Sequence, residues 1–195
     1  PSVRHSSGGM DRGGFSGGDA AGTAASRSAQ ERGRLRANLR LSVLDIQESF
    51  NVLEKARVPV LIAIQGGCVG GAVDMARACD CRYATRDAYF VIQEINIGMM
   101  ADVGTFNRMP KQLPEAVVRE LGYTGDRLGA ERAERLGFVN GLFDTHEALV
   151  EGALAVGRKI ASKAPVAVAA PKQLIHYTRD QGGAQSSEFS TDTHA

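Results

Sequence analysis

Three carboxylates lie in the part of this sequence that is best suited to chemistry. Asp74 follows a glycine-rich stretch, Glu94 ends an apolar run, and Asp102 lies in a loop bounded by Gly98 and Gly104. An acid in apolar surroundings is costly to bury unpaired, so it tends to be hydrogen-bonded, metal-bound or functional. Two acids around one pocket could move a proton from one carbon atom to another. For each acid alone, a helix cap or a surface charge is the alternative interpretation.

The glycines at 66, 67, 70 and 71 join an apolar run to a predicted helix. They lack the Gly-Lys-Ser/Thr ending of a phosphate loop and do not have the Gly-x-Gly-x-x-Gly register of a dinucleotide site. An oxyanion site fits better, because the first turn of a helix presents unpaired N–H groups and the positive end of its dipole. Gly71 lets a ligand approach the backbone, and one such donor stabilises a developing oxyanion by about 3 kcal/mol. Asp74, one turn further on, can face the same cavity.

The elements around this junction alternate between strands and helices. Residues 58–64 form an apolar, β-branched run that predicts a buried strand, 71–78 a helix, and 81–84 and 89–92 two more strands. This order is typical of an α/β fold with parallel strands.

Helices are predicted on both sides of this region. Upstream, one apolar stripe recurs at helical spacing at Leu35, Leu39, Val43, Ile46, Phe50 and Leu53. Downstream, helices are predicted over 113–122, 129–136, 145–163 and 164–177, with Thr145 as a cap and an extended segment over 138–143. Residues 6–30 are rich in Gly, Ser and Ala and predict a mobile loop.

The bulk composition narrows the function. A chain of 195 residues is enough for one sizeable core, and its net charge of +1 does not indicate binding to nucleic acid or an anionic membrane. Arginines 32, 34, 36 and 40 form either a solvated helix face or a site for a phosphorylated ligand. No apolar run approaches the ~20 residues that span a bilayer. Three cysteines are too few for a disulfide framework, so we expect buried thiols and no metal site.

Three stretches carry a family resemblance. They are residues 64–74 (Ile-Gln-Gly-Gly-Cys-Val-Gly-Gly-Ala-Val-Asp), 78–80 (Ala-Cys-Asp) and 90–98 (Phe-Val-Ile-Gln-Glu-Ile-Asn-Ile-Gly). They resemble the signature of the crotonase, or enoyl-CoA hydratase/isomerase, superfamily. Within it, Asp74, Glu94 and the stretch 101–105 (Ala-Asp-Val-Gly-Thr) resemble the Δ3,5-Δ2,4-dienoyl-CoA isomerases. Residues 5–11 resemble the loop that supplies the second oxyanion N–H group, here at Met10, although Ser6 or Ser7 replaces an aromatic residue and Arg12 an aliphatic one.

The resemblance implies an α/β fold with a crotonase-like ββα spiral core. We expect this core over residues 1–125, a helical C-terminal region over 126–180 and a disordered tail over 181–195. The family's opening strands and last helix have no counterpart here, so we expect a chain truncated at both ends. The family also implies a homotrimer or hexamer that is mitochondrial or peroxisomal in a eukaryote and cytoplasmic in a bacterium.

The resemblance further implies an acyl-CoA substrate and no cofactor, since CoA is part of the substrate. Glu94 would take a proton at C2, Asp102 would give one at C6, and the N–H groups of Gly71 and Met10 would hold the thioester oxygen. Asp74 would orient its neighbours. This chemistry isomerises 3,5-dienoyl-CoA to 2,4-dienoyl-CoA in fatty-acid β-oxidation. The alternatives are an enoyl-CoA hydratase, in which a glutamate usually stands at position 74 and a glycine at 102, and a non-catalytic crotonase-like binding protein.

Overall fold

The structure is a computed structural model that describes residues 17–180, with side chains over 31–179. Its described residues fall into two compact units, 17–42 and 43–180, and helix α1 (Gly17–Lys55) contributes to both. The helix begins within the range 6–30 that the composition predicted as a loop, so that prediction is wrong over 17–30. The alanines of this stretch favour a helix, and a helix extends readily once its first turns exist. Residues 6–16 and the predicted tail 181–195 lie outside the described part.

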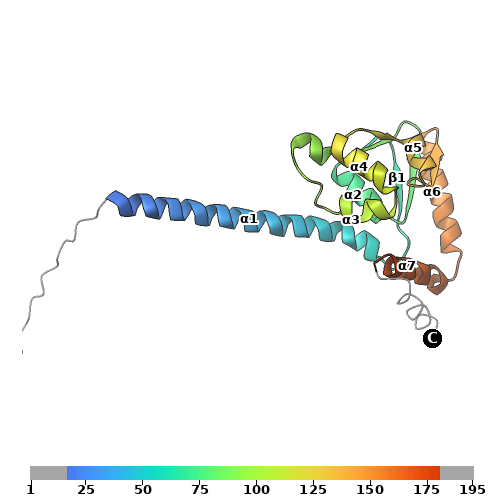
Figure 1. Cartoon of the computed structure of the whole chain (residues 1–195). Coiled ribbons are helices and arrows are strands. Elements are labelled where there is room, and N and C mark those ends of the chain that lie inside the picture. Colours follow the sequence, from blue (N-terminus) through green and yellow to red (C-terminus); the bar gives the residue numbers. More distant parts are fainter. Residues whose placement is uncertain (1–16, 181–195) are drawn as a thin grey trace, which may run out of the picture. The chain divides into compact units, whose positions relative to one another are not determined.

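Two small sheets form the centre of the second unit. In the first, β1 (Leu61–Ile64), β3 (Cys81–Thr85) and β6 (Gly141–Phe143) pair in parallel in the order β1-β3-β6. In the second, β4 (Tyr89–Val91) pairs in parallel with β2 (Gly67–Val69) and antiparallel with β5 (Leu128–Gly129). Helix α6 (His146–Ala161) packs on all three strands of the first sheet, and Figure 1 shows α2 (Gly71–Ala78) on the other side of β1. The predicted α/β fold with parallel strands is confirmed.

Strand β2 was missed by the sequence analysis, which interpreted residues 66–71 as a turn alone. The chain leaves the first sheet after Ile64 and at once begins the second, where Cys68 pairs with Phe90 and is 4% exposed. Three residues are too few for a recognisable alternation of polar and apolar side chains. As a result, the glycine turn is held by strand pairing on one side and by α2 on the other.

The core runs through the whole second unit. Phe90 and Phe138 pack edge to face at 5.1 Å between ring centroids, and both are at most 2% exposed. Leu128 of β5 is fully buried, and β6 completes the first sheet. Residues 126–180 therefore do not form a region apart from a core over 1–125, because their short strands complete both sheets.

Four later helices have bounds close to those predicted, namely α4 (Glu115–Thr124), α5 (Ala130–Arg135), α6 and α7 (Pro165–Asp180). The short helix α3 (Thr105–Arg108) and the 3₁₀ turns η1 (Gln93–Ile97) and η2 (Met109–Lys111) were not predicted. The predicted cap is confirmed, since Ala148 N donates to Thr145 Oγ1 at 3.2 Å. Helix α7 is anchored by Lys172, whose Nζ donates to Asp80 Oδ2 at 2.8 Å. Across residues 17–180, no helix combines the length and the apolar character needed to cross a membrane.

Candidate active site

The first turn of α2 is fixed between two strands. Gly70 has φ 56°, and its N–H donates to the carbonyl of Val91 at 2.9 Å, which ties the turn to the end of β4. Its own carbonyl accepts from Val73 N at 2.7 Å. Gly71 is the first residue of α2, so its N–H is among those that have no acceptor within the helix. Gly71 therefore stands at the helix end that sequence reasoning assigned to an oxyanion donor.

Asp74 lies in the second half of that first turn and is fully buried. Its Oδ1 accepts a hydrogen bond of 2.7 Å from Thr105 Oγ1, whereas Oδ2 has no partner among the described residues. Burial raises the pKa of Asp74 above its usual range, although the Thr105 hydroxyl and the nearby charges of Arg77 and Arg108 act in the opposite direction. Asp74 is thus a support for the site's framework rather than a group open to solvent.

Glu94 reaches the glycine turn from the other side. It follows β4 as part of η1, and its Oε1 lies only 3.2 Å from the place that a Cβ at position 70 would occupy. Its backbone carbonyl accepts from Met99 N at 2.8 Å, which folds the segment after η1 back on itself. The absence of a side chain at Gly70 therefore gives the half-buried Glu94 carboxylate its place beside the start of α2.

Asp102 lies in the loop that returns from this segment to α2. Its backbone carbonyl accepts a 2.6 Å hydrogen bond from Gln47 Nε2 of α1, and its side chain is half-buried. Two and three residues later, Gly104 and Thr105 contact α2 through Arg77 and Asp74. The structure thus brings the loop of Asp102 back to the helix that carries Asp74. Met10 lies outside the described residues.

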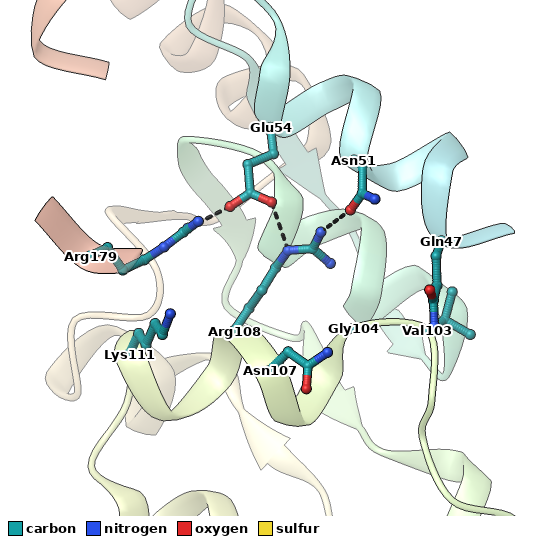
Figure 2. Close-up of a pocket in the computed structure, with 9 residues that line it drawn as sticks. All are labelled: Gln47, Asn51, Glu54, Val103, Gly104, Asn107, Arg108, Lys111 and Arg179. Carbon is teal, nitrogen blue, oxygen red and sulfur yellow. Dashed lines mark hydrogen bonds and ion pairs between the residues drawn. The ribbon is translucent and has the colours of Figure 1, made fainter. Parts of the chain in front are cut away.

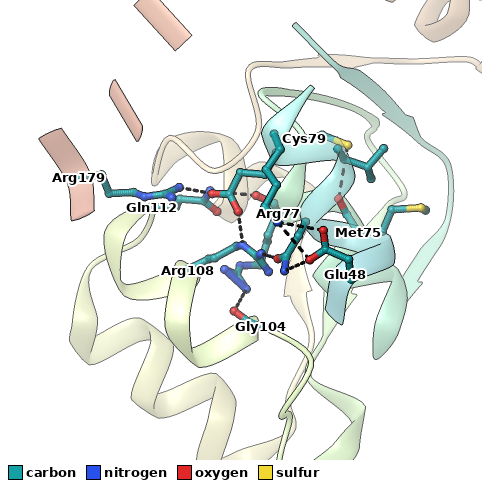
Figure 3. A network of polar contacts seen from close by, with 12 residues as sticks. Glu48, Met75, Arg77, Cys79, Gly104, Arg108, Gln112 and Arg179 are labelled. Atoms are coloured by element: carbon teal, nitrogen blue, oxygen red, sulfur yellow. Dashed lines mark hydrogen bonds and ion pairs between the residues drawn. The ribbon is translucent and has the colours of Figure 1, made fainter. Parts of the chain in front are cut away.

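Arg77 and Arg108 belong to the same surroundings, and sequence reasoning did not identify either of them. Arg77 is 1% exposed and donates from Nη1 to the Gly104 carbonyl at 3.2 Å, as Figure 3 shows. Arg108 donates from Nε to Glu54 Oε2 at 2.9 Å. A spacing of three residues places Arg77 on the same face of α2 as Asp74, and this was the available signal.

Beside Gly104, on the side of α1, lies a polar pocket of about 250 Å³. Figure 2 shows Glu54 between the guanidinium groups of Arg108 and Arg179, and Arg108 also donates to Asn51. The pocket is lined by Gln47, Asn51, Glu54, Val103, Gly104, Asn107, Arg108, Lys111 and Arg179. This ionic cluster links α1 and α7 to the helix that follows the Asp102 loop.

The apolar side chains around the site differ in their exposure to solvent. Ile92 is core, at 2% exposed, whereas Ile97, Met99 and Met100 are 63%, 55% and 70% exposed in the segment after Glu94.

The three cysteines are free thiols, of which Cys68 and Cys79 are buried and Cys81 is partly buried. Within the described part of the chain, no group of three His, Cys, Asp or Glu side chains could hold a metal ion.

A profile described as enoyl-CoA hydratase/isomerase matches residues 13–195 of this chain. The mitochondrial Δ(3,5)-Δ(2,4)-dienoyl-CoA isomerase of Pongo abelii is 41% identical over 157 residues, which are 80% of this chain and 48% of that protein. The peroxisomal Δ(3,5)-Δ(2,4)-dienoyl-CoA isomerase of Arabidopsis thaliana is 33% identical over 156 residues, 80% of this chain and 56% of that protein. This chain therefore spans about half the length of the curated relatives it matches.

Solved structures agree with the sequence relatives. The crystal structure of an enoyl-CoA hydratase from Polaromonas sp. JS666 superposes with a TM-score of 0.76 at 27% identity, and the match covers 86% of this chain and 65% of that one. The strand–glycine turn–helix junction and the returning loop described above lie within a crotonase-type α/β fold. This chain belongs to the enoyl-CoA hydratase/isomerase family.

Proposed function

We propose that this chain carries the catalytic acids of an isomerase that converts 3,5-dienoyl-CoA to 2,4-dienoyl-CoA. The main structural support is the Thr105–Asp74 hydrogen bond, which brings the loop of Asp102 back to the helix whose first turn adjoins Glu94. Further support comes from the named activity of the relatives from Pongo abelii and Arabidopsis thaliana. The substrate is an acyl-CoA thioester. We also propose, from the family resemblance, a homotrimer or hexamer.

In this mechanism the thioester oxygen binds the N–H groups of Gly71 and Met10, which stabilise an enolate. Glu94 takes the proton from C2, and the electron pair of that C–H bond forms the C2–C3 double bond. The electron pair of the C3–C4 π bond moves to C4–C5. The pair of the C5–C6 π bond forms the new C6–H bond with the proton from Asp102, which is left as a carboxylate. The product is conjugated with the thioester, and no electrons are gained or lost. The reaction therefore needs neither a metal nor a redox cofactor.

The burial of Asp74 favours this reaction over hydration of an alkene. A hydratase needs two acids that hold one water molecule, and Asp74 is the residue at one of those two positions. Here its carboxylate is fully buried, and one oxygen is bonded to Thr105. This geometry suits an acid that supports its neighbours, and it leaves Glu94 and Asp102 as the proton-transferring pair.

The test is the ultraviolet absorbance of the conjugated product during incubation of the whole chain with 3,5-dienoyl-CoA. We expect turnover by the wild type, a loss of about 100-fold or more in Asp102→Asn, and no loss in the exposed control Asp126→Asn. Hydration of 2-enoyl-CoA without isomerisation would show that the hydratase alternative is correct. Binding of the CoA ester without either reaction would favour the non-catalytic alternative.

A further inference from the structure

Arg77 is a buried cation, and most of its side-chain N–H groups have no hydrogen-bond acceptor among the described residues. It is 1% exposed, yet among the described residues only its Nη1 donates a hydrogen bond, to the Gly104 carbonyl, and Nε and Nη2 have no partner there. Buried donors without acceptors are costly, so proteins rarely retain them without a reason. None of the ion pairs among the described residues includes Arg77. The negative charge that attracts it most strongly is that of Asp74.

Arg82, a second buried arginine in the same core, has its donors bound to backbone carbonyls, as is expected of an arginine that stabilises the fold. It is 7% exposed, and it donates to the carbonyls of Phe138 at 2.5 Å, Cys79 at 2.8 Å and Ala76 at 3.3 Å. Its hydrogen bonds join β3 to the end of α2 and to the segment before β6. Stabilisation of the fold accounts for Arg82, but it does not account for Arg77.

The single acceptor of Arg77 lies at a decisive place. The Gly104 carbonyl is held by Arg77, and the next residue, Thr105, is bonded to Asp74. Helix α2 therefore holds two consecutive residues of the returning loop, just after Asp102. Gly104 has φ 131°, and a Cβ there would overlap Arg108 Nη1, so this peptide is confined between two guanidinium groups.

Arg77 also supplies positive charge to Asp74. The titratable groups that face Asp74 are Arg77 on α2 itself, Arg108 on α3 and the Cys68 thiol on β2. Burial, with the added effect of Asp74, raises the pKa of Cys68 to about 12, so this thiol stays neutral at physiological pH. The two arginines therefore oppose the effect of burial and favour the ionised form of Asp74.

We propose that Arg77 is a positioning residue of the isomerase, which fixes the Gly104 peptide and thereby the catalytic Asp102, and which places a positive charge beside Asp74. The inference rests on the proposed function. Because Arg77 is buried, it acts through these two residues and does not touch the substrate. Its unsatisfied donors are retained for this role at the expense of stability.

The test compares Arg77→Met, Arg77→Lys and the control Arg82→Lys by turnover of 3,5-dienoyl-CoA, pH dependence of kcat and thermal midpoint. Arg77→Met has a similar volume and removes the unsatisfied donors, which offsets the loss of a positive charge beside Asp74, so we expect a midpoint close to that of the wild type. We expect its kcat to fall about 10- to 100-fold with KM changed less than about twofold, because a displaced catalytic group loses rate rather than binding.

The pH profile separates this role from a purely structural one. Loss of the Arg77 charge raises the pKa of Asp74, so activity in Arg77→Met should disappear at a higher pH on acidification. Arg77→Lys keeps the charge, so the pH at which its activity falls on acidification (the acid limb of the profile) should return to the wild-type value. Arg82→Lys should lower the thermal midpoint and leave the limb where it is.

Three results would overturn the inference. They are an unchanged kcat in folded Arg77→Met, a fall of kcat in step with the thermal midpoint without a shift of the limb, and a failure of Arg77→Met to fold. If the wild-type protein itself does not isomerise the dienoyl ester, the proposed function is wrong, and the role of Arg77 falls with it. An active wild type with an equally active Arg77→Met contradicts the role of Arg77 alone.

Discussion

The hydroxyl of Thr105 donates a 2.7 Å hydrogen bond to Oδ1 of the fully buried Asp74, across 31 residues of sequence. The bond fastens the loop that carries Asp102 to the helix that begins at the glycine turn. It satisfies only one carboxylate oxygen, since Oδ2 has no partner in the described structure. The site therefore contains a carboxylate whose charge is poorly compensated, and this has consequences for both stability and chemistry.

The first consequence concerns Asp74→Asn. Burial raises the pKa of Asp74 above its ordinary value of 3.8, so the folded protein binds this proton more tightly than the unfolded chain does. Its contribution to stability is therefore complete below the ordinary pKa and is lost as the pH rises through the raised one. Asn keeps an acceptor for Thr105 and carries no charge. We expect the free energy of unfolding of Asp74→Asn to exceed that of the wild type increasingly as the pH rises above the ordinary pKa, by about 1 kcal/mol.

Denaturant unfolding at several pH values measures this difference. The exposed control Asp87→Asn should follow the wild type at every pH. A stability difference that is constant, or that shrinks as the pH rises, would show that the buried carboxylate is not the source. We expect Asp74→Asn to lose isomerase activity even where it is more stable, which is the usual trade-off at a functional site.

A second prediction concerns Gly70. Its φ of 56° is costly for any other residue, and a Cβ there would lie 3.2 Å from Glu94 Oε1. Gly70→Ala should lose about 1–2 kcal/mol from the backbone alone. The added methyl group also displaces the Glu94 carboxylate, so we expect kcat on 3,5-dienoyl-CoA to fall about 10- to 100-fold.

Gly137→Ala is the matched control for this change. Gly137 has φ 77°, but a Cβ there meets nothing within 4 Å. Both variants therefore carry the backbone strain, and only Gly70→Ala carries the contact with Glu94. Equal activities in the two variants would mean that the Glu94 carboxylate does not depend on the space above Gly70.

The sequence was informative where local rules decide the structure. Helix 71–78 has its predicted bounds because glycines precede it and small residues allow it to pack closely. The Thr145 cap is likewise a local interaction. Strand β2 was not predicted, because three residues become a strand only when the distant β4 pairs with them. The helical conformation of residues 17–30 in α1 was not predicted, because their glycines and serines lower the mean helix propensity that their alanines raise.

The candidate site was predictable to the same extent. Motif resemblance identified Glu94, Asp102 and Asp74 as acids, but their partners lie far away in sequence. Nothing local indicates that Thr105 bonds to Asp74 or that Arg77 reaches the carbonyl of Gly104. Composition favours the surface for any arginine, so the burial of Arg77 could be found only from the folded arrangement.

A third prediction concerns Glu54, which joins three helices through its two oxygens. Oε2 accepts from Arg108 Nε at 2.9 Å, Oε1 pairs with Arg179 Nη1 at 2.5 Å, and the side chain is 14% exposed. Burial alone would raise the pKa of Glu54, but the hydrogen bond from Arg179 and the charge of Arg108 lower it below its ordinary 4.5. Such a group stabilises the fold above its ordinary pKa, and the stabilisation is lost as the pH falls through the lowered value.

Glu54→Gln should therefore destabilise the protein by about 3 kcal/mol at pH 7, because it leaves two largely buried cations without their shared anion. The deficit should shrink as the pH falls through the lowered pKa of Glu54, because the wild-type side chain then becomes protonated as well. Glu48→Gln is the control, since Glu48 pairs with Lys55 at 2.9 Å on the surface and its loss should have little effect. Denaturant unfolding at several pH values measures the free energy of unfolding of both variants. An equal loss in the two would contradict the stabilising role of the buried Glu54 ion pairs. Because Arg108 confines the Gly104 peptide, Glu54→Gln should also lower isomerase activity, whereas Glu48→Gln should not.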